Sequence, residues 1–131
     1  MPGPLAGVRV LELATVVLGP WACQILGDLG ADVVKVEPPA GDSNRQVGPM
    51  RNPDMGALFL TCNRNKRSVV LDLKHPGGRA AALRLAAGAD VLVHNYRPAA
   101  LARLHFGYRN ICLPTQQHRR AEFLMDAVGL E

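Results

Sequence analysis

Residues 8–37 read VRVLELATVVLGPWACQILGDLGADVVKVE, and this stretch decides the fold of the chain. Its first part, Val8–Leu13, is a short β-branched run that is typical of a buried strand. Pro20 and Gly30 then predict the first position and the end of a helix with apolar residues along one face. Residues 32–37 alternate as a second strand, which must stop at the two prolines that follow. The order predicts one strand, helix, strand unit with a right-handed crossover.

The same order of elements recurs further along the chain. A polar, glycine-rich stretch at 39–52 predicts a surface loop, and a proline and a glycine open and close another helix at 76–88. The other predicted elements are a short helix at 55–61, strands at 68–73 and 90–94, and helices at 98–104 and 116–128. This alternation favours an α/β fold with a parallel sheet. Ligands of such sheets bind beyond the carboxyl ends of the strands, here the turns after Leu13, Glu37 and His94.

Length and composition indicate one soluble domain. The chain has 131 residues, of which 48% are hydrophobic, and this material suffices for a single core. Glycine or charge interrupts every apolar stretch, and the N-terminus lacks the order of a signal peptide, so we expect a cytoplasmic protein without a membrane span. The three cysteines are widely spaced and the four histidines show no metal-binding spacing. Neither a disulfide nor a metal site is predicted.

The net charge of +4 is unevenly distributed along the chain. Residues 1–44 carry a net charge of −3, residues 45–120 one of +10, and the last eleven residues −3. A basic middle indicates a polyanionic partner, which is a nucleic acid, an acidic surface or a phosphorylated small molecule. The aromatic residues are too few and too scattered to stack bases, which disfavours nucleic acid.

Two clusters supply the candidate binding residues. The first is the cationic turn NRNKRS, residues 63–68, before the third predicted strand. The second follows the fourth predicted strand and contains Asn95, Arg97 and Arg103. In a parallel sheet the two clusters lie at opposite strand ends unless the loop before the third strand folds back. Spacing leaves two interpretations open for each cluster: it is either a solvated part of the surface or a binding site for an anion.

The sequence shows no catalytic constellation. Glu12, Glu37 and Asp72 lie in or at the ends of predicted strands, but no spacing fixes two of them as an acid and base pair. A carboxylate in such a position often caps a helix or pairs with an arginine. No serine has a GxSxG setting, and neither GxGxxG nor a P-loop pattern occurs. We predict no catalytic residue.

Three stretches carry a resemblance to a known family. They are LAGVRVLEL…GPWACQILGDLGADVVKVEPPAGDSNR, then NRNKRSVVLDLK, then ADVLVHNYRPAALARL. Their order and spacing resemble the N-terminal part of the class III CoA-transferase family, which includes formyl-CoA transferases, carnitine CoA-transferases and α-methylacyl-CoA racemases. The resemblance covers residues 4–108.

The resemblance implies a Rossmann-like sheet with flanking helices that binds coenzyme A, which is a substrate in this family. Carried over by position, the loop Val16, Val17 and Leu18 lies along CoA. Asn95 and Tyr96 flank its pantetheine or adenine part.

The resemblance also implies that basic side chains hold the phosphates of CoA. Arg103 and the region of Lys66 and Arg67 take this role by position, and Arg97 stands beside them as a further CoA-binding residue. Pro38 and Pro39 stand where some members have an arginine near the adenine. The cationic turn is interpreted as part of a polyanion seat, because arginine and lysine pair with phosphate groups.

Complete members of the family are much longer and carry a catalytic aspartate that forms covalent intermediates. The segment with this aspartate has no counterpart here. We therefore expect residues 1–108 to be a CoA-binding part with a fold that is incomplete relative to the family. Residues 109–131 are expected to form a divergent tail, which weakly resembles a piece of the family's second domain.

The functional prediction is a truncated CoA-binding part of a class III CoA-transferase. Whether the complete protein is a transferase or a racemase stays open, and so does activity of this chain by itself. One alternative is a stand-alone CoA-binding or nucleotide-binding module without catalysis, and a less favoured one is a basic nucleic-acid-binding domain. Complete relatives form interlocked dimers, so the resemblance implies a homo-oligomer. This chain lacks the length to interlock in that way, but an unfinished sheet leaves apolar surface or a strand edge exposed, which favours self-association or aggregation.

Overall fold

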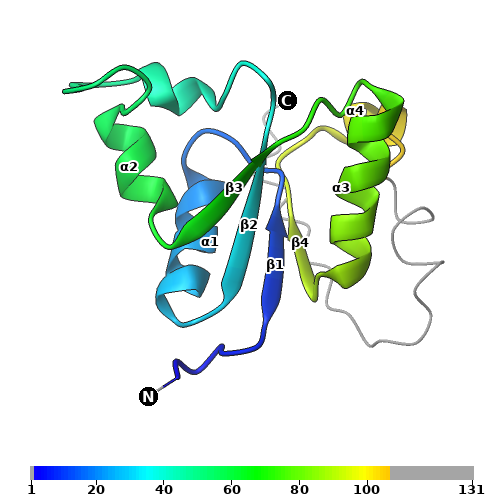
Figure 1. Cartoon of the computed structure of the whole chain (residues 1–131), viewed down its shortest axis with the longest axis horizontal. Helices are drawn as coiled ribbons and strands as arrows, with labels where there is room; N and C mark the ends of the chain where they lie inside the picture. Colours follow the sequence, from blue (N-terminus) through cyan, green and yellow to red (C-terminus); the bar gives the residue numbers. More distant parts are fainter. Residues whose placement is uncertain (1, 107–131) are drawn as a thin grey trace, which may run out of the picture.

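The computed structural model describes residues 2–106, which form a four-stranded sheet with helices around it (Figure 1). The strands are β1 (Arg9–Glu12), β2 (Asp32–Glu37), β3 (Lys66–Val70) and β4 (Val91–Val93). The helices are α1 (Leu18–Asp28), α2 (Ala57–Asn63), α3 (Pro76–Gly88), α4 (Pro98–Arg103) and a short 3-10 helix, η1 (Ser43–Gln46). The predicted tail at 109–131, including its helix, lies outside the described residues.

The sheet confirms the predicted α/β fold. Its strands are parallel and stand in the order β3, β2, β1, β4, as do the first four strands of a Rossmann sheet. β1 pairs with β2 on one side, with Glu12 opposite Lys35, and with β4 on the other side. The chain thus moves outward from β1 through β2 to β3 and then returns to the far side of β1. The strand order reverses between β1 and β4.

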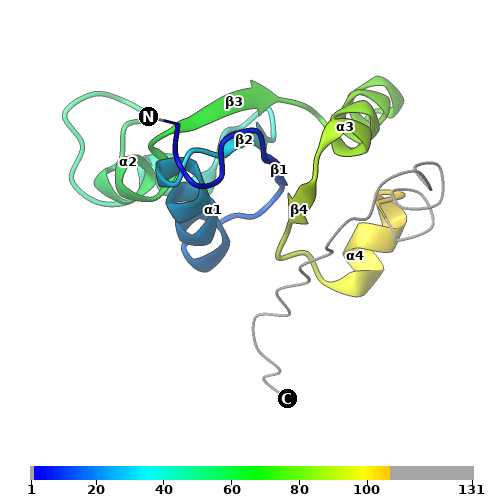
Figure 2. The ribbon, with the colours of Figure 1, turned by 90° about the horizontal axis from the view of Figure 1, so that it is seen from below.

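Helices cover both faces of the sheet. Helix α1, with α2 beside it, lies on one face, and α3 lies on the opposite one (Figure 2). Neighbouring residues of β1 face different layers: Val10 packs in a cluster with Cys23 of α1, and Leu11 in a cluster with Ala82 of α3. Alternation of this kind is the two-residue period of a strand. Because both faces are covered, Val10 and Leu11 are each only 1% exposed.

Phe106 anchors the end of the described chain. It follows α4, is 1% exposed and packs with Leu11 in the cluster on the α3 face, where Leu101 and Leu104 of the α4 region also lie. Burial of a side chain of this size contributes about 1.5–3 kcal/mol. This packing fixes α4 to the sheet and thereby holds the connection at 94–97, which leaves the carboxyl end of β4.

Three predicted boundaries need correction. The pattern predicts the third strand at 68–73, but β3 covers Lys66–Val70, so Lys66 and Arg67 belong to the strand and not to a turn before it. β3 is an edge strand of the described sheet, and edge strands accept charged side chains. The predicted surface loop at 39–52 contains η1, and α1 begins at Leu18, two residues before the predicted start.

One face of α1 exposes a stripe of large apolar side chains. Leu18, Trp21, Ile25 and Leu29 follow one another at helical spacing and are 40% to 56% exposed. Contiguous apolar surface of this kind marks interaction sites in water-soluble proteins. Within the described residues, no helix has the length and apolar character needed to cross a bilayer.

We propose that the chain associates with itself through this stripe on α1. Ile25→Lys places a charge in the middle of the stripe and is expected to shift the protein toward a smaller species in sedimentation velocity. Ala80→Lys adds the same charge at an exposed position of α3 and serves as the control. A concentration-independent monomer, or an equal effect of both substitutions, would contradict the proposal.

Candidate functional site

The turn between β1 and α1 lies where the strand order reverses, at the carboxyl end of β1. Ligands of open α/β sheets bind in the crevice at this point. A hollow of about 160 Å³ opens there, and we call it the switch crevice. It is lined by Thr15, Val16, Val17, Leu18, Gly19, His94 and Asn95. The turn after β1 and the connection after β4 therefore form its two walls.

Side chains from other segments hold the first two carbonyl groups of the turn. The Nζ of Lys35, in β2, donates a hydrogen bond of 2.8 Å to the Ala14 carbonyl. Asn95 donates its Nδ2 to the Thr15 carbonyl over 2.9 Å, and its Oδ1 accepts from the Thr15 N–H over 3.1 Å. Both polar atoms of the Asn95 amide are thus engaged by one residue of the opposite wall, which ties the two walls together.

The third carbonyl of the turn, that of Val16, accepts a hydrogen bond from Nδ2 of Asn44 in η1. Val16 has a φ of 70°, in the left-handed region that a β-branched residue rarely adopts. A conformation of this kind costs about 1–3 kcal/mol and persists only where surrounding contacts impose it. The contacts to the three successive carbonyls are what imposes it here.

Successive N–H groups of the turn lack acceptors within the described residues. The C=O and N–H bonds of a planar trans peptide point in opposite directions, so a carbonyl held by the protein turns the next N–H away from that contact. Among residues 2–106, no acceptor contacts the N–H groups of Val16, Val17, Leu18 and Gly19. Successive free N–H groups beside a left-handed residue, at the start of a helix, form a surface that favours anions.

Gly19 allows α1 to begin directly against the end of β1. A Cβ atom on Gly19 would lie 2.4 Å from the Cβ of Ala14, which is far inside van der Waals contact. Lys66 of β3 adds a further restraint, because its Nζ donates to the Pro20 carbonyl over 2.7 Å. The first turn of α1 is therefore fixed with respect to β1 and β3.

A buried network of four charged side chains lies behind the turn. Lys35 Nζ is 3.1 Å from Glu12 and 2.9 Å from Asp42, and Lys66 Nζ is 2.7 Å from the second oxygen of Glu12. Each of these side chains is at most 2% exposed. Two cations balance two anions, and removal of one member of such a pair typically costs about 3–5 kcal/mol. The network therefore fixes the three strands and the start of η1 relative to one another.

Burial and nearby charges shift the titration of these groups. Burial lowers the pKa of a lysine, but at Lys35 the carboxylates of Glu12 and Asp42 outweigh it and the pKa is raised. At Lys66 burial dominates and lowers the pKa, although Glu12 opposes it. Burial, with a smaller effect of Glu12, raises the pKa of Cys23 to about 12. The Cys23 thiol therefore stays protonated, which makes it unsuited to nucleophilic chemistry.

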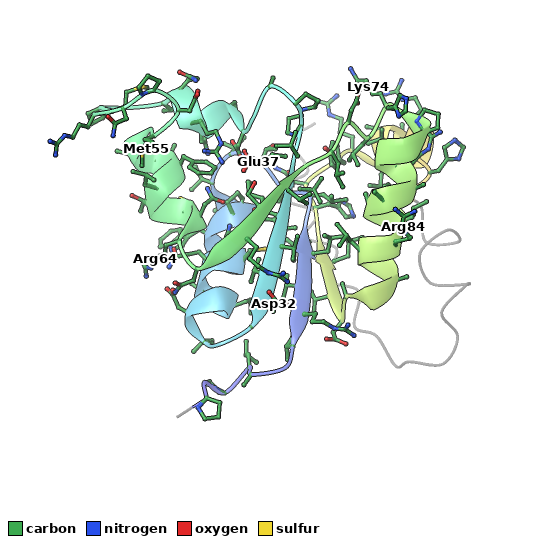
Figure 3. All side chains as sticks on the ribbon, in the orientation of Figure 1. Asp32, Glu37, Met55, Arg64, Lys74 and Arg84 are labelled. Atoms are coloured by element: carbon green, nitrogen blue, oxygen red, sulfur yellow. The ribbon has the colours of Figure 1, made fainter. Side chains whose placement is uncertain are left out.

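Glu37, at the carboxyl end of β2, holds the loop that leads to η1 (Figure 3). Its carboxylate accepts two hydrogen bonds of 2.7 Å from Arg45, one of 2.6 Å from Ser68 and one of 3.0 Å from the N–H of Asp42. The Arg45 guanidinium also lies 3.8 Å from the ring centre of Phe59. Burial would raise the pKa of Glu37, but these donors outweigh it and lower the pKa to about 2.

The structure brings part of the predicted site together. Val16, Val17, Leu18 and Asn95 line the switch crevice. The side chain of Asn95 is committed to the backbone of the turn, so its observed role is to join the walls of the crevice.

Three further predicted residues follow β4 in the chain. Tyr96 packs against the cluster on the α3 face, and burial raises the pKa of its phenol. Arg97 is the exposed residue that precedes α4, and Arg103 is the exposed last residue of that helix. Both residues therefore follow β4 in the chain and are exposed to solvent.

Lys66 and Arg67 are not brought to the switch crevice. The Lys66 ammonium is buried in the charge network, and Arg67 pairs with Asp32 over 2.6 Å at the amino ends of the strands (Figure 3). Arg64 pairs with Asp28 over 2.6 Å in the same region. Each of the three cations of the sequence NRNKRS thus has a carboxylate partner. Lys66 is buried, whereas Arg64 and Arg67 form their ion pairs at the surface.

A larger hollow, of about 230 Å³, lies at the amino ends of the strands and is lined in part by Arg9, Arg67, Arg84 and residues of α3. Arg67 is occupied by Asp32, and Arg9 lies 3.8 Å from Asp90. Parallel sheets bind ligands at the other strand ends, so we favour the smaller switch crevice. Within the described part of the chain, no group of histidine, cysteine or acidic side chains is arranged to hold a metal ion.

The sequence analysis missed Lys35, Asp42 and Asn44 as site residues. A signal for Lys35 existed, because the run DVVKVE places a lysine in a strand that is otherwise apolar at its centre. No such signal marks Asn44, which contacts the turn 28 residues earlier in the chain.

The family model of CoA-transferase family III matches residues 5–112, which is most of the chain. The chain belongs to CoA-transferase family III. It is 47% identical over 109 residues to a mouse succinyl-CoA:glutarate CoA-transferase, in a match that covers 82% of this chain and 25% of that relative. It is 44% identical over 110 residues to an acetyl-CoA:oxalate CoA-transferase from Acetobacter aceti, covering 83% of this chain and 28% of that relative.

Two solved structures share the fold. A CAIB/BAIF family protein from Brucella suis superposes with a TM-score of 0.80 at 41% identity, covering 85% of this chain and 30% of that protein. A hypothetical protein from Mycobacterium tuberculosis gives a TM-score of 0.80 at 38% identity, and the match covers 92% of this chain and 33% of that protein. The chain thus spans between a quarter and a third of the length of these family members.

The low pKa of Glu37 predicts that acid destabilises the loop that carries Asn44. The folded pKa of about 2 lies below the ordinary value of 4.5, so the stabilisation is present above pH 4.5 and is lost as the pH falls toward 2. The stabilisation is about 3 kcal/mol at pH 7, of which about 2 kcal/mol is lost by pH 3. Urea unfolding at pH 7 and at pH 3 measures this loss of unfolding free energy. The loss should be smaller in Glu37→Gln than in the unmodified chain. Asp72→Asn removes an exposed carboxylate and is the control. Its unfolding free energy should fall between pH 7 and pH 3 by as much as that of the unmodified chain.

Proposed function

We propose that this chain is the CoA-binding part of a class III CoA-transferase and that CoA or an acyl-CoA binds along the switch crevice. The observation that carries the proposal is the row of four N–H groups, from Val16 to Gly19, that have no acceptor among the described residues of this family III chain. Coenzyme A is a polyanion with several phosphate charges. Backbone N–H groups at the start of a helix suit such a ligand without needing a basic side chain.

Apolar and basic side chains around the crevice support the same proposal. Val16 and Leu18 are 53% and 56% exposed at its rim, which leaves apolar surface for the pantetheine chain. Arg97 and Arg103 are exposed after β4 and supply mobile cations for phosphate. Lys66 and Arg67 are no part of this proposal, because Lys66 is buried against Glu12 and Arg67 pairs with Asp32 at the opposite ends of the strands.

The chemistry of complete relatives needs a carboxylate that the switch crevice does not supply. Transfer of CoA between carboxylic acids proceeds through covalent intermediates on a carboxylate nucleophile. The seven lining residues include no aspartate or glutamate. The nearby carboxylates Glu12, Glu37 and Asp42 are buried and bound by lysine, arginine and hydroxyl groups. We infer that residues 2–106 bind and orient the CoA portion, and that the nucleophile lies on other residues.

The alternative of a nucleic-acid-binding domain finds less support. It depends on an open basic surface in the middle of the chain, whereas four of the cations there lie in ion pairs with acidic side chains: Arg45, Arg64, Lys66 and Arg67. A stand-alone CoA-binding module uses the same crevice and differs from the favoured proposal only in what the complete protein does.

Calorimetry at low salt is expected to show CoA binding with micromolar or weaker affinity. Binding is expected because the backbone site is preformed, and it is expected to be weak because this chain lacks other parts of a complete family member. Arg97→Gln should weaken binding about threefold to tenfold by removing a phosphate partner. Arg84→Gln removes the same charge from α3, where it lines the hollow at the opposite strand ends, and should leave the affinity unchanged. No heat and no NMR shift with millimolar CoA would overturn the proposal.

The chain by itself is expected not to transfer CoA from succinyl-CoA to glutarate, or from acetyl-CoA or formyl-CoA to oxalate. Chromatography of the CoA esters measures this directly, with a complete family III enzyme as the positive control. Turnover above background that a single carboxylate-to-amide substitution in this chain abolishes would show that the nucleophile lies within it.

A further inference from the structure

We propose that Asn44 is a positioning residue that holds Val16 in its left-handed conformation and so sets the shape of the switch crevice. The inference deepens the proposed function and rests on it where it concerns CoA. Asn44 lies in η1, does not line the crevice and is 3% exposed. Its effect on a ligand must therefore pass through the Val16 carbonyl, to which its Nδ2 donates.

The backbone of Asn44 is itself held by the buried charge network. Asp42 accepts from the Asn44 N–H over 2.9 Å with one carboxylate oxygen, and the other oxygen lies 2.9 Å from Lys35. Lys35 in turn holds the Ala14 carbonyl at the start of the turn. Lys35 and Asn44 thus restrain the turn at both ends, and Asp42 links them.

The loop around η1 is braced on its far side as well. The N–H of Gly56 donates to the Arg45 carbonyl over 2.8 Å, and a Cβ on Gly56 would lie 2.6 Å from the Asn44 carbonyl. Arg45 is bound at its other end by the carboxylate of Glu37. These contacts leave η1 little freedom to move away from the turn, so it can impose a strained conformation on Val16.

Loss of the Asn44 donor has a defined consequence for the turn. The Val16 carbonyl would lose its partner, and the Val16 backbone would be free to turn about both its φ and its ψ toward the region of negative φ that L-residues prefer. The 16–17 peptide would reorient with this change. The Val17 N–H belongs to that peptide and would turn with it. The row of N–H groups would then no longer present one continuous surface to an anion.

The direct test is NMR spectroscopy of the full chain without any ligand. In Asn44→Ala, the φ-dependent couplings and the amide shifts of Val16 and Val17 are expected to lose the left-handed signature, while the core residue Val10 keeps its shifts. Asn52→Ala is the matched control, because Asn52 is an exposed asparagine of the same loop whose amide contacts only the sulfur of Met55, at 3.8 Å. A Val16 that stays left-handed in Asn44→Ala overturns the inference.

A double-mutant cycle with Val16→Gly separates positioning from general stability. Glycine adopts a positive φ without strain, so Asn44 should matter less in the Val16→Gly background. We expect Asn44→Ala to weaken CoA binding about tenfold in the otherwise unmodified chain and less than about twofold in that background. Equal losses in both backgrounds overturn the inference.

The arms of the test also distinguish the two proposals. If the unmodified chain does not bind CoA, the proposed function fails and the couplings of Val16 still decide the role of Asn44. If Asn44→Ala does not fold, folding restored by Val16→Gly supports the inference, and continued failure to fold overturns it.

Discussion

The cross-strand ion pair between Glu12 and Lys35 is the constraint on which the rest of the described structure depends. Both side chains are buried, so a slip of β1 against β2 by one residue would place unpaired charges in the interior at a cost of several kcal/mol. Lys35 also binds the Ala14 carbonyl and Asp42, which ties the register of the sheet to the turn after β1 and to η1. Lys66 completes the charge balance from the third strand. One buried pair thereby fixes both the sheet and the crevice beside it.

This arrangement assigns different tasks to polar side chains and to the backbone. Lysine and asparagine side chains bind the carbonyl groups of the turn, and the N–H groups of the turn are the groups that we propose for an anion. A backbone site of this kind loses no side-chain entropy when it binds, because it is already rigid. The basic side chains of NRNKRS have partners within the fold, since Arg64 pairs with Asp28 at the end of α1 and Arg67 with Asp32 at the start of β2. A basic stretch in a sequence is thus a poor guide to a phosphate site until its partners are known.

Much of the fold could be predicted because it follows from local pattern. The two-residue period at 32–37 predicts β2 with its observed bounds. The proline and glycine at the ends of 76–88 predict α3 with its observed bounds. The start of β3 could not be read in the same way, because Lys66 looks like a solvated turn residue until Glu12 is placed opposite its ammonium. The crevice was expected after Leu13 and His94 on general grounds, and Val16–Leu18 with Asn95 line it. The role of Asn44 depends on a contact between distant segments that no spacing indicates.

Periodicity, proline and glycine positions and motif spacing are properties of the linear chain. They were enough to predict the succession of strands and helices, the parallel sheet and the membership in CoA-transferase family III. Tertiary structure alone decided which cations are neutralised and which backbone groups stay free. Lys66 and Arg97 are both basic residues in polar stretches, yet one is buried against Glu12 and the other is exposed after β4. The difference arises from which acids the folded sheet brings within about 3 Å, and a charge is set by its neighbours in space rather than in sequence.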